Sequence, residues 1–585
     1  MTYHAPVDDI VFALKAAADL PQVLAKIGAS DLDEETIRAI LDEAGRFATE
    51  VLDPLNWGGD RAGSKLADGV VHTPPGWKNA YDRFAQGGWS GLPCPTEFGG
   101  QGLPSVVSMA ASEIWNGANL AFGVCPLLTN GAIDSVYIGG CAELKERFLP
   151  KMVSGEWTGT MNLTEPQAGS DLNAVATSAV KQGDGTYKIT GTKIFISYGE
   201  HELTPNIIHL VLARLPDAPP GTRGISLFLV PKVLVNDDGS LGARNDVICA
   251  GLEHKLGIIA SPTCVMKFGE QGGATGYLVG EENHGLATMF VMMNAARLAV
   301  GVQGVAIAER ATQRALAFAG ERRQGRALGS ASKAMDPIAV HPDVRRMLLT
   351  MQAMTSAARG ICFATAAATD ISHRAADETD RKHAASRVAL LTPVAKAFGT
   401  DAAVEVASLG IQVHGGMGFV EETGAAQHLR DARILPIYEG TNGIQAIDLV
   451  MRKLPLEGGD AVRAYLAEVS ATCAAVDAVS DPAFGQMAAR MRDTLQALEG
   501  ATVWMAHAAA NNPEAALASA TPYLRLFSLA AGGHYLAKAA LMGGAGGPNR
   551  VRLARFFAEH ISTSGPGLAV CVRDGADVVA GTLVS

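Results

Sequence analysis

Residues 412–445 read QVHGGMGFVEETGAAQHLRDARILPIYEGTNGIQ. Near the end of this stretch, Glu439 follows Pro436 and a few apolar residues, in a turn that precedes a predicted helix. An acidic residue before a glycine is usually a solvated turn residue, so Glu439 alone indicates no chemistry. The pair Gly415-Gly416 alone is typical of a turn between two helices. The stretch gains meaning from two upstream segments, MNLTEPQAGSDL at 161–172 and KIFIS at 193–197.

Outward from these segments, the residue pattern changes twice along the chain. Residues 1–158 are predicted to be helical, and either Asp31 or Asp33 is expected to cap the helix over 32–51. Residues 159–281 are predicted to form a β-domain, with short strands at 187–190, 193–197, 207–213, 225–230 and 263–268 and a hairpin turn at 183–185. Helical spacing returns over 282–455. After a predicted linker at 455–459, residues 456–585 form an Ala-rich helical extension.

Length and composition agree with several packed domains that are mainly helical. The chain has 585 residues, too many for one core. Hydrophobic residues make up 48% and charged residues 18%, which is a globular balance. Aromatic residues are only 6%, and Ala and Gly are abundant, which favours closely packed helices. The expected fold class is therefore α+β, mainly α.

The charge and the cysteines argue against several classes of function. The formal net charge is −11 and no basic stripe is visible, so a nucleic acid is not the expected partner. The eight cysteines show neither CxxC spacing nor an accompanying His cluster, so no metal site and no disulfide framework is predicted. We expect buried free thiols in a reducing compartment.

The start of the chain, MTYHAPVDDIVFALK, lacks the basic and apolar regions of a secretory signal. No uninterrupted apolar run reaches the length needed to cross a bilayer. From these two observations we expect a cytoplasmic protein without a membrane span.

Generic catalytic motifs do not explain the chain. There is no Walker A loop, no HExxH and no GxSxG, and GGAGG at 543–547 does not match the spaced dinucleotide fingerprint. The three segments quoted above, in this order, resemble the acyl-CoA dehydrogenase family over roughly residues 30–455. The resemblance implies an N-terminal helical domain, a middle β-barrel-like domain, a helical bundle and here an extra C-terminal helical domain. The whole chain resembles a long branch of that family that includes enzymes acting on 3-(methylthio)propanoyl-CoA.

The resemblance implies an FAD-dependent α,β-dehydrogenation of an acyl-CoA thioester to the 2-enoyl-CoA. Glu439 occupies the family's position for the base that removes the α-proton, while flavin N5 takes the β-hydride. A carboxylate suits this task in a dry pocket, which raises its pKa toward the working pH. Some relatives carry the base on the central helix instead, but the matching position here is near Ala296, just before Arg297.

The family's binding residues carry over position by position. Contacts to the flavin or its phosphates within one chain are expected from Met161, Leu163, Thr164, Ser170, Phe195, Ser197, Thr441 and Gly443. Contacts to the FAD of a neighbouring subunit are expected from Arg322, Gln324, Gln412, Gly415 and Gly416. Substrate contacts are expected from Ser170, Asn294, Arg297, Tyr438 and Gly440.

This sequence departs from the family's usual pattern at several of these positions. Phe195 stands where many relatives have Trp, and Ser197 where Thr is common. After Arg322 and Arg323 the chain continues Gln-Gly instead of Phe-Gly, which leaves that alignment open by one residue. Without the family, Phe195 and Ser197 are ordinary strand positions, Arg322 ends a solvated helix, and Arg297 is a salt-bridged helix residue.

Three functional alternatives remain open from sequence. The first is a dehydrogenase that passes electrons to an electron-transfer flavoprotein. The second is an acyl-CoA oxidase with the same residues, in which oxygen takes the electrons. The third is a non-catalytic DNA-associated protein on the same scaffold, which the acidic charge disfavours. Sharing of FAD implies a homo-oligomer, dimer or tetramer; the acyl chain remains open between 3-(methylthio)propanoyl and medium or long chains.

Overall fold

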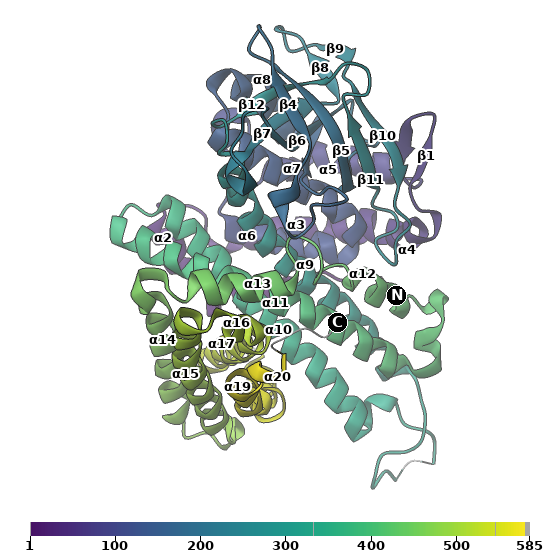
Figure 1. Cartoon of the computed structure of the whole chain (residues 1–585). Helices are drawn as coiled ribbons and strands as arrows, with labels where there is room; N and C mark the ends of the chain where they lie inside the picture. The colour runs from purple at the N-terminus through teal and green to yellow at the C-terminus, as the bar shows by residue number, and fades with distance from the viewer. Residues whose placement is uncertain (1, 332, 544–545, 580–585) are drawn as a thin grey trace.

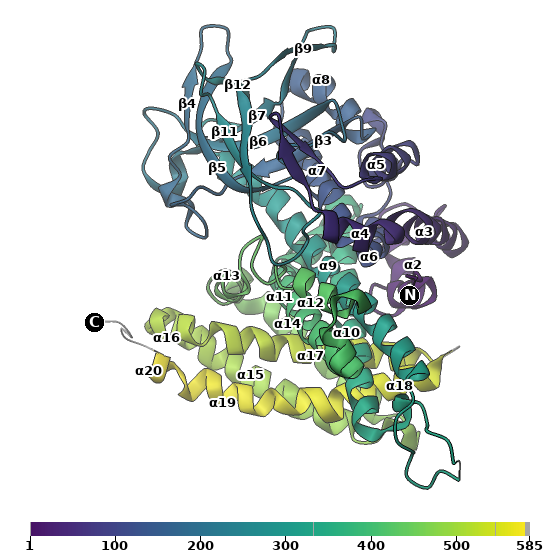
Figure 2. The same cartoon turned by 90° about the vertical axis from the view of Figure 1, so that its right-hand side faces the viewer.

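The computed structural model describes residues 2–331, 333–543 and 546–579, and the side chains of 291 and 292 are not part of that description. The curved sheet and the N-terminal helices lie at one end of the molecule, above a bundle of long helices (Figure 1). The C-terminal helices run along the far side of that bundle (Figure 2). The order helical, β, helical follows the predicted fold class.

The N-terminal part is helical, with one exception. Its helices are α1 (Val7–Ala16), α2 (Leu20–Lys26), α3 (Glu34–Phe47), α4 (Asp53–Ala62), α5 (Trp77–Gln86), α6 (Ser105–Ala118), α7 (Leu120–Gly139) and α8 (Ala142–Val153). Asp33 caps α3, because its carboxylate accepts a hydrogen bond of 2.8 Å from the Thr36 amide. The exception is a small hairpin of β1 (Lys65–Ala67) and β2 (Val70–His72), which the helical prediction missed.

The middle part is built on an eight-stranded sheet. Its strands are β3 (Trp157–Asn162), β4 (Ser178–Lys181), β5 (Tyr187–Ser197), β6 (Asn206–Arg214), β7 (Ile225–Pro231), β10 (Val247–Leu252), β11 (Thr263–Phe268) and β12 (Ala274–Val279). Strands β8 (Val233–Val235) and β9 (Leu241–Arg244) form a separate pair. The predicted hairpin joins β4 to β5. The two strands predicted at 187–190 and 193–197 are one strand, which passes through Gly191 where a Cβ would lie 2.4 Å from Thr177 Oγ1.

The helical bundle is packed closely through small residues. It consists of α9 (Gly285–Glu321), α10 (Pro342–Arg374), α11 (Glu378–His414), α12 (Ala425–Ala432) and α13 (Asn442–Asp448). A Cβ on Gly301 would lie 2.8 Å from the Ala395 carbonyl oxygen, and one on Gly304 would lie 2.3 Å from that of Gly399. The backbones of α9 and α11 are therefore in contact. Such close packing requires small residues, which agrees with the abundance of Ala and Gly in the sequence.

The C-terminal extension packs on the bundle. Its helices are α14 (Asp460–Asp477), α15 (Met487–Asn511), α16 (Pro513–Ala518), α17 (Ala520–Met542), α18 (Gly547–Phe556), α19 (Gly565–Asp574) and α20 (Ala576–Val579). Helix α17 packs against α10, α11 and α13. The extension thus backs α13, the short helix that follows Glu439 (Figure 1).

The expectation of no membrane span and the prediction of buried cysteines can be compared with the structure, and only the second needs correction. Helices α7 and α9 are long and apolar enough to cross a bilayer, yet 61% and 75% of their apolar windows are buried inside the protein. Burial of this extent is typical of core helices. Cys141 and Cys571 are exposed, whereas the other six cysteines are buried free thiols as expected.

Candidate active site

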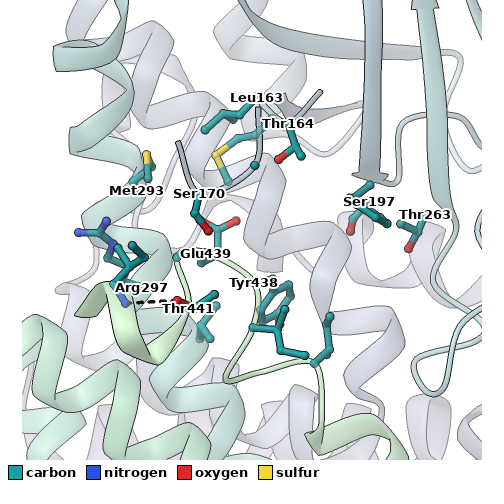
Figure 3. A pocket seen from close by; sticks show the side chains of 18 of the residues that line it. Leu163, Thr164, Ser170, Ser197, Thr263, Met293, Arg297, Tyr438, Glu439 and Thr441 are labelled. Atoms are coloured by element: carbon teal, nitrogen blue, oxygen red, sulfur yellow. Dashed lines mark hydrogen bonds between the residues drawn. The ribbon is translucent and has the colours of Figure 1, made fainter. Parts of the chain in front are cut away.

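A cavity of about 910 Å³ lies where the β-domain meets the helical bundle. Its walls come from the strand ends of the sheet, from α9 and from the loop before α13 (Figure 3). Eleven of the predicted site residues line it, namely the predicted base Glu439 and ten predicted for cofactor or substrate: Met161, Leu163, Thr164, Ser170, Phe195, Ser197, Arg297, Tyr438, Gly440 and Thr441. Segments far apart in the sequence therefore face one space.

Glu439 projects into the cavity from a backbone turn that few side chains tolerate. Its φ is +56° and that of Gly440 is +80°, both in the left-handed region. The buried Gln445 amide donates to the carbonyls of Glu439 and Gly440, at 3.3 and 3.1 Å. Phe195 and Ile258, which also line the cavity, have positive φ as well. Strained backbone of this kind gathers at functional sites and persists because the surroundings hold it.

The surroundings of Glu439 suit a general base. Its side chain is half-buried in the cavity wall, and burial raises the pKa of the carboxyl above its ordinary value. The nearby cations Arg297 and Lys396 lower that pKa and so moderate the effect of burial. Among the described residues the Glu439 carboxylate makes no hydrogen bond. A carboxyl with a raised pKa and free oxygens can accept a proton from a molecule in the cavity.

Arg297 lies on α9 beside the same loop. It lines the cavity and also pairs with an acidic residue. Its Nη1 lies 3.5 Å from Asp448 Oδ2 and donates a hydrogen bond of 3.3 Å to Asn294 Oδ1. Burial lowers its pKa, while Asp448 and Glu439 act in the opposite direction. Asn294 itself is exposed and, in the part of the chain that the structure describes, lies outside the cavity wall. Its predicted contact with substrate stays a prediction.

Strand ends of the sheet form the opposite wall. Ser197 is paired in register with Thr263 of β11, and both lie at the cavity (Figure 3). Phe195 leaves 59% of its surface exposed there, so the ring offers a face to a flat partner. Below it, the fully buried Lys193 donates to the Leu163 carbonyl and to Glu165 Oε1, at 3.0 and 2.8 Å. This buried pair ties the 161–172 segment to the KIFIS strand.

The residues predicted to reach a neighbouring subunit lie outside this cavity. These residues are Arg322, Gln324, Gln412, Gly415 and Gly416, and the structure describes all of them. The ends of α9 and α11 near these residues are adjacent, because Phe318 stacks on His414 with ring centroids 4.4 Å apart. Gly415 has φ +59° and open space around it. Gly443 also lies outside the described cavity wall. These assignments stay predictions.

Sequence reasoning missed several cavity residues. One wall is a stripe of α9 at the spacing of one helix face: Leu286, Phe290, Met293, Arg297, Val300 and Gln303. That period of three and four was visible in the sequence, and Arg297 marked the face. Tyr438 Oη donates to Gln303 Oε1 and so ties the loop to α9. Lys255, Arg433 and Arg452 also line the cavity, from segments without a recognisable pattern.

Comparison with protein families agrees with this geometry. Residues 34–156, 160–270 and 283–454 match the models of the N-terminal, middle and C-terminal domains of acyl-CoA dehydrogenase. The chain belongs to the acyl-CoA dehydrogenase family. Residues 465–582 match a further model described as acetyl-CoA dehydrogenase C-terminal like.

Individual acyl-CoA dehydrogenases match over most of their length. The 3-methylmercaptopropionyl-CoA dehydrogenase of Ruegeria pomeroyi is 50% identical over 92% of this chain and 91% of its own. A butyryl-CoA dehydrogenase of Syntrophomonas wolfei is 37% identical over 91% of this chain and 88% of its own. An acyl-CoA dehydrogenase of Bacillus anthracis, solved in complex with FAD, is 20% identical over 93% of this chain and 89% of its own, with a TM-score of 0.74. This last match supports the fold alone.

Proposed function

We propose that the protein catalyses FAD-dependent α,β-dehydrogenation of an acyl-CoA thioester, with Glu439 as the base. One observation carries the proposal: Glu439 lines the same cavity as the predicted flavin residues of the 161–172 segment and of the end of β5 (Figure 3). Membership of the family supports the same reaction class. A base and a hydride acceptor on opposite sides of one space are what removal of a proton and a hydride from adjacent carbons needs.

The chain's own residues account for the proton transfer. The half-buried Glu439 carboxylate takes the proton from the carbon next to the thioester carbonyl, and Gln445 holds the loop that carries it. The base must be deprotonated, and burial raises its pKa. The rate of proton removal therefore rises as pH increases through that raised pKa, and it is low at pH values below the pKa. Arg297 and Lys396 extend the active range toward lower pH because they favour the carboxylate.

The residues present fit a flavin. Thr164 and Ser197 bring hydroxyl groups to the cavity, and Phe195 presents an exposed ring against which a flat heterocycle can stack. The volume of about 910 Å³ matches a site for a large cofactor. Bound FAD would accept the hydride from the β-carbon of the substrate. Membership of the acyl-CoA dehydrogenase family supports the same cofactor.

The proposed substrate is 3-(methylthio)propanoyl-CoA or another short acyl-CoA. The support is the 50% identity to the Ruegeria pomeroyi enzyme, whose name states that substrate, and the butyryl-CoA enzyme among the relatives. A substrate panel from butyryl- to palmitoyl-CoA, with 3-(methylthio)propanoyl-CoA included, should be followed by loss of oxidised flavin absorbance. A highest kcat/KM for palmitoyl-CoA would contradict the short-chain proposal.

The base assignment is tested by Glu439→Gln. This substitution keeps the size of the side chain and removes the proton acceptor. We expect normal FAD content and loss of substrate-dependent flavin reduction by at least about 10³-fold, at the upper part of the range for general base removal. Anaerobic stopped-flow absorbance measures it. Reduction within tenfold of the unsubstituted enzyme would remove Glu439 from this role.

We further propose that electrons leave to an electron-transfer flavoprotein, that the protein is a homo-oligomer and that it is cytoplasmic. The open Gly415-Gly416 turn supports the oligomer, because the predicted contacts to a neighbour's FAD gather there. Mixing of substrate-reduced enzyme with air tests the electron acceptor. Slow reoxidation is expected, whereas rapid release of hydrogen peroxide would identify an oxidase instead.

A further inference from the structure

A lysine that contributes only its charge to the proton transfer above also contacts the loop of the base. Lys396 is on α11 and its side chain is fully buried. Its Nζ donates a hydrogen bond of 2.9 Å to Asn442 Oδ1. Asn442 is the first residue of α13, three positions after Glu439. Burying an ammonium group costs free energy unless nearby groups pair with it or hydrogen-bond to it. The buried position of Lys396 therefore indicates a specific role.

Asn442 is the anchor of the loop that carries the base. Its amide nitrogen donates to the Pro436 carbonyl at 3.0 Å, which closes the loop around Glu439. Its side-chain Nδ2 donates to Asp401 Oδ1 at 2.8 Å and to Thr400 Oγ1 at 3.0 Å. Its Oδ1 accepts from Lys396. The loop is therefore fixed to α11 through one side chain, whose oxygen accepts from Lys396 Nζ at 2.9 Å and from Thr400 Oγ1 at 3.3 Å.

The charges around Lys396 connect it to the base itself. Glu439 and Asp401 favour its charged form and Arg297 disfavours it, while burial lowers its pKa to about 7. In return, Lys396 is one of the two cations that lower the pKa of Glu439. The charged neighbours of Lys396 have charged partners of their own.

Arg297 faces Asp448 and Arg452. Asp401, whose pKa burial raises, faces Arg525 and Glu405. Among the described residues around the loop, Lys396 and Arg297 are thus the cations that act on Glu439, from two different helices. Arg297 is shared with Asp448, which reduces the part of its charge that Glu439 experiences.

We propose that Lys396 is a positioning residue for the base: through Asn442 it holds the loop of Glu439 in place, and from behind the loop it supplies positive charge that favours the carboxylate form. This inference rests on the proposed function, because Glu439 must act as the base. It predicts that the lysine affects the pH dependence of proton removal, which a purely structural lysine would leave unchanged.

The test compares three variants of the flavin-loaded enzyme. Lys396→Met keeps the length of the side chain but removes the charge and the donor. Asp401→Asn keeps the shape and an acceptor for Asn442 but removes a charge that keeps Lys396 protonated. Lys382→Met, at an exposed position of the same helix, is the control. The rate of flavin reduction by saturating 3-(methylthio)propanoyl-CoA or butyryl-CoA is measured anaerobically from pH 5 to pH 9, together with flavin content and melting temperature.

For Lys396→Met, the acid limb of the profile should move upward by about one pH unit, which makes reduction about tenfold slower on the acid side. Asp401→Asn should move the limb in the same direction by less, and Lys382→Met should not move it. If Lys396→Met does not retain flavin, Asp401→Asn decides. An unchanged limb in a folded, flavin-loaded Lys396→Met or, failing that, Asp401→Asn overturns the inference. If the unsubstituted enzyme is reduced by no acyl-CoA, the proposed function fails first and the inference falls with it.

Discussion

Gly440 follows the base, and its side of the loop leaves no room for a side chain. Its φ is +80°, and a Cβ there would lie 2.9 Å from Gln445 Nε2. Gln445 is fully buried, and its Oε1 has no hydrogen-bond partner among the described residues. A Cβ on Gly440 would therefore press on the amide that donates to the carbonyls of Glu439 and Gly440. Substitution Gly440→Ala should disturb the base without touching its carboxylate.

The size of the effect follows from two costs. A left-handed conformation costs an L-residue roughly 1–2 kcal/mol. Displacement of the Gln445 amide removes two hydrogen bonds of about 1 kcal/mol each. Together these make about 3–4 kcal/mol of local destabilisation, which the loop can relieve by moving. A displacement of about 1 Å of a catalytic group can cost on the order of 10²-fold in rate.

In the Gly440→Ala variant we therefore expect the rate of flavin reduction by acyl-CoA to fall on the order of 10²-fold, with FAD content preserved. Anaerobic stopped-flow absorbance measures the rate. Gly28→Ala is the matched control, because Gly28 has φ +71° but open space around it and does not line the described cavity. It carries the left-handed strain alone. A Gly440→Ala rate within twofold of the unsubstituted enzyme would refute the argument that the Gln445 clamp positions the base.

Two further predictions concern buried ion pairs. Lys193→Met leaves Glu165 buried without its cation beside the predicted flavin strand, so FAD affinity should fall about tenfold or more. The increase in FAD fluorescence on release measures the affinity. An unchanged affinity would show that the pair does not support the flavin site. Arg359→Met leaves the buried Glu113 without its bidentate partner and should lower the free energy of unfolding by about 3–5 kcal/mol. Chemical denaturation measures this, with the exposed pair of Arg46 as a control expected to lose under about 1 kcal/mol in Arg46→Met. Equal losses in the two variants would contradict it.

Local features of the fold were readable from the sequence. The cap at Asp33, the hairpin before Tyr187 and the long helix that contains Arg297 each depend on residues close together in the chain. The same is true of the change from helical to β and back to helical patterns. Where a local signal was weak it failed: β1 and β2 are three residues each, too short for alternation to be visible.

The candidate site was only partly readable. The motifs marked residues such as Thr164 and Glu439, because chemistry constrains their type. They gave no sign of Gln303 or Lys396, whose roles depend on partners more than 40 positions away, Tyr438 and Asn442 respectively. A buried lysine on an Ala-rich helix looks in sequence like any solvated one.

By itself the sequence determined which elements form and which residue types are available for chemistry, since periodicity, caps and turns act over a few residues. Only the tertiary structure decided that the 161–172 segment, the end of β5, one face of α9 and the loop at Glu439 surround one cavity. It also decided that Glu439 is half-buried between Arg297 and Lys396. The physical reason is that desolvation and the interaction between charges depend on distance in space, which the order of residues along the chain does not fix.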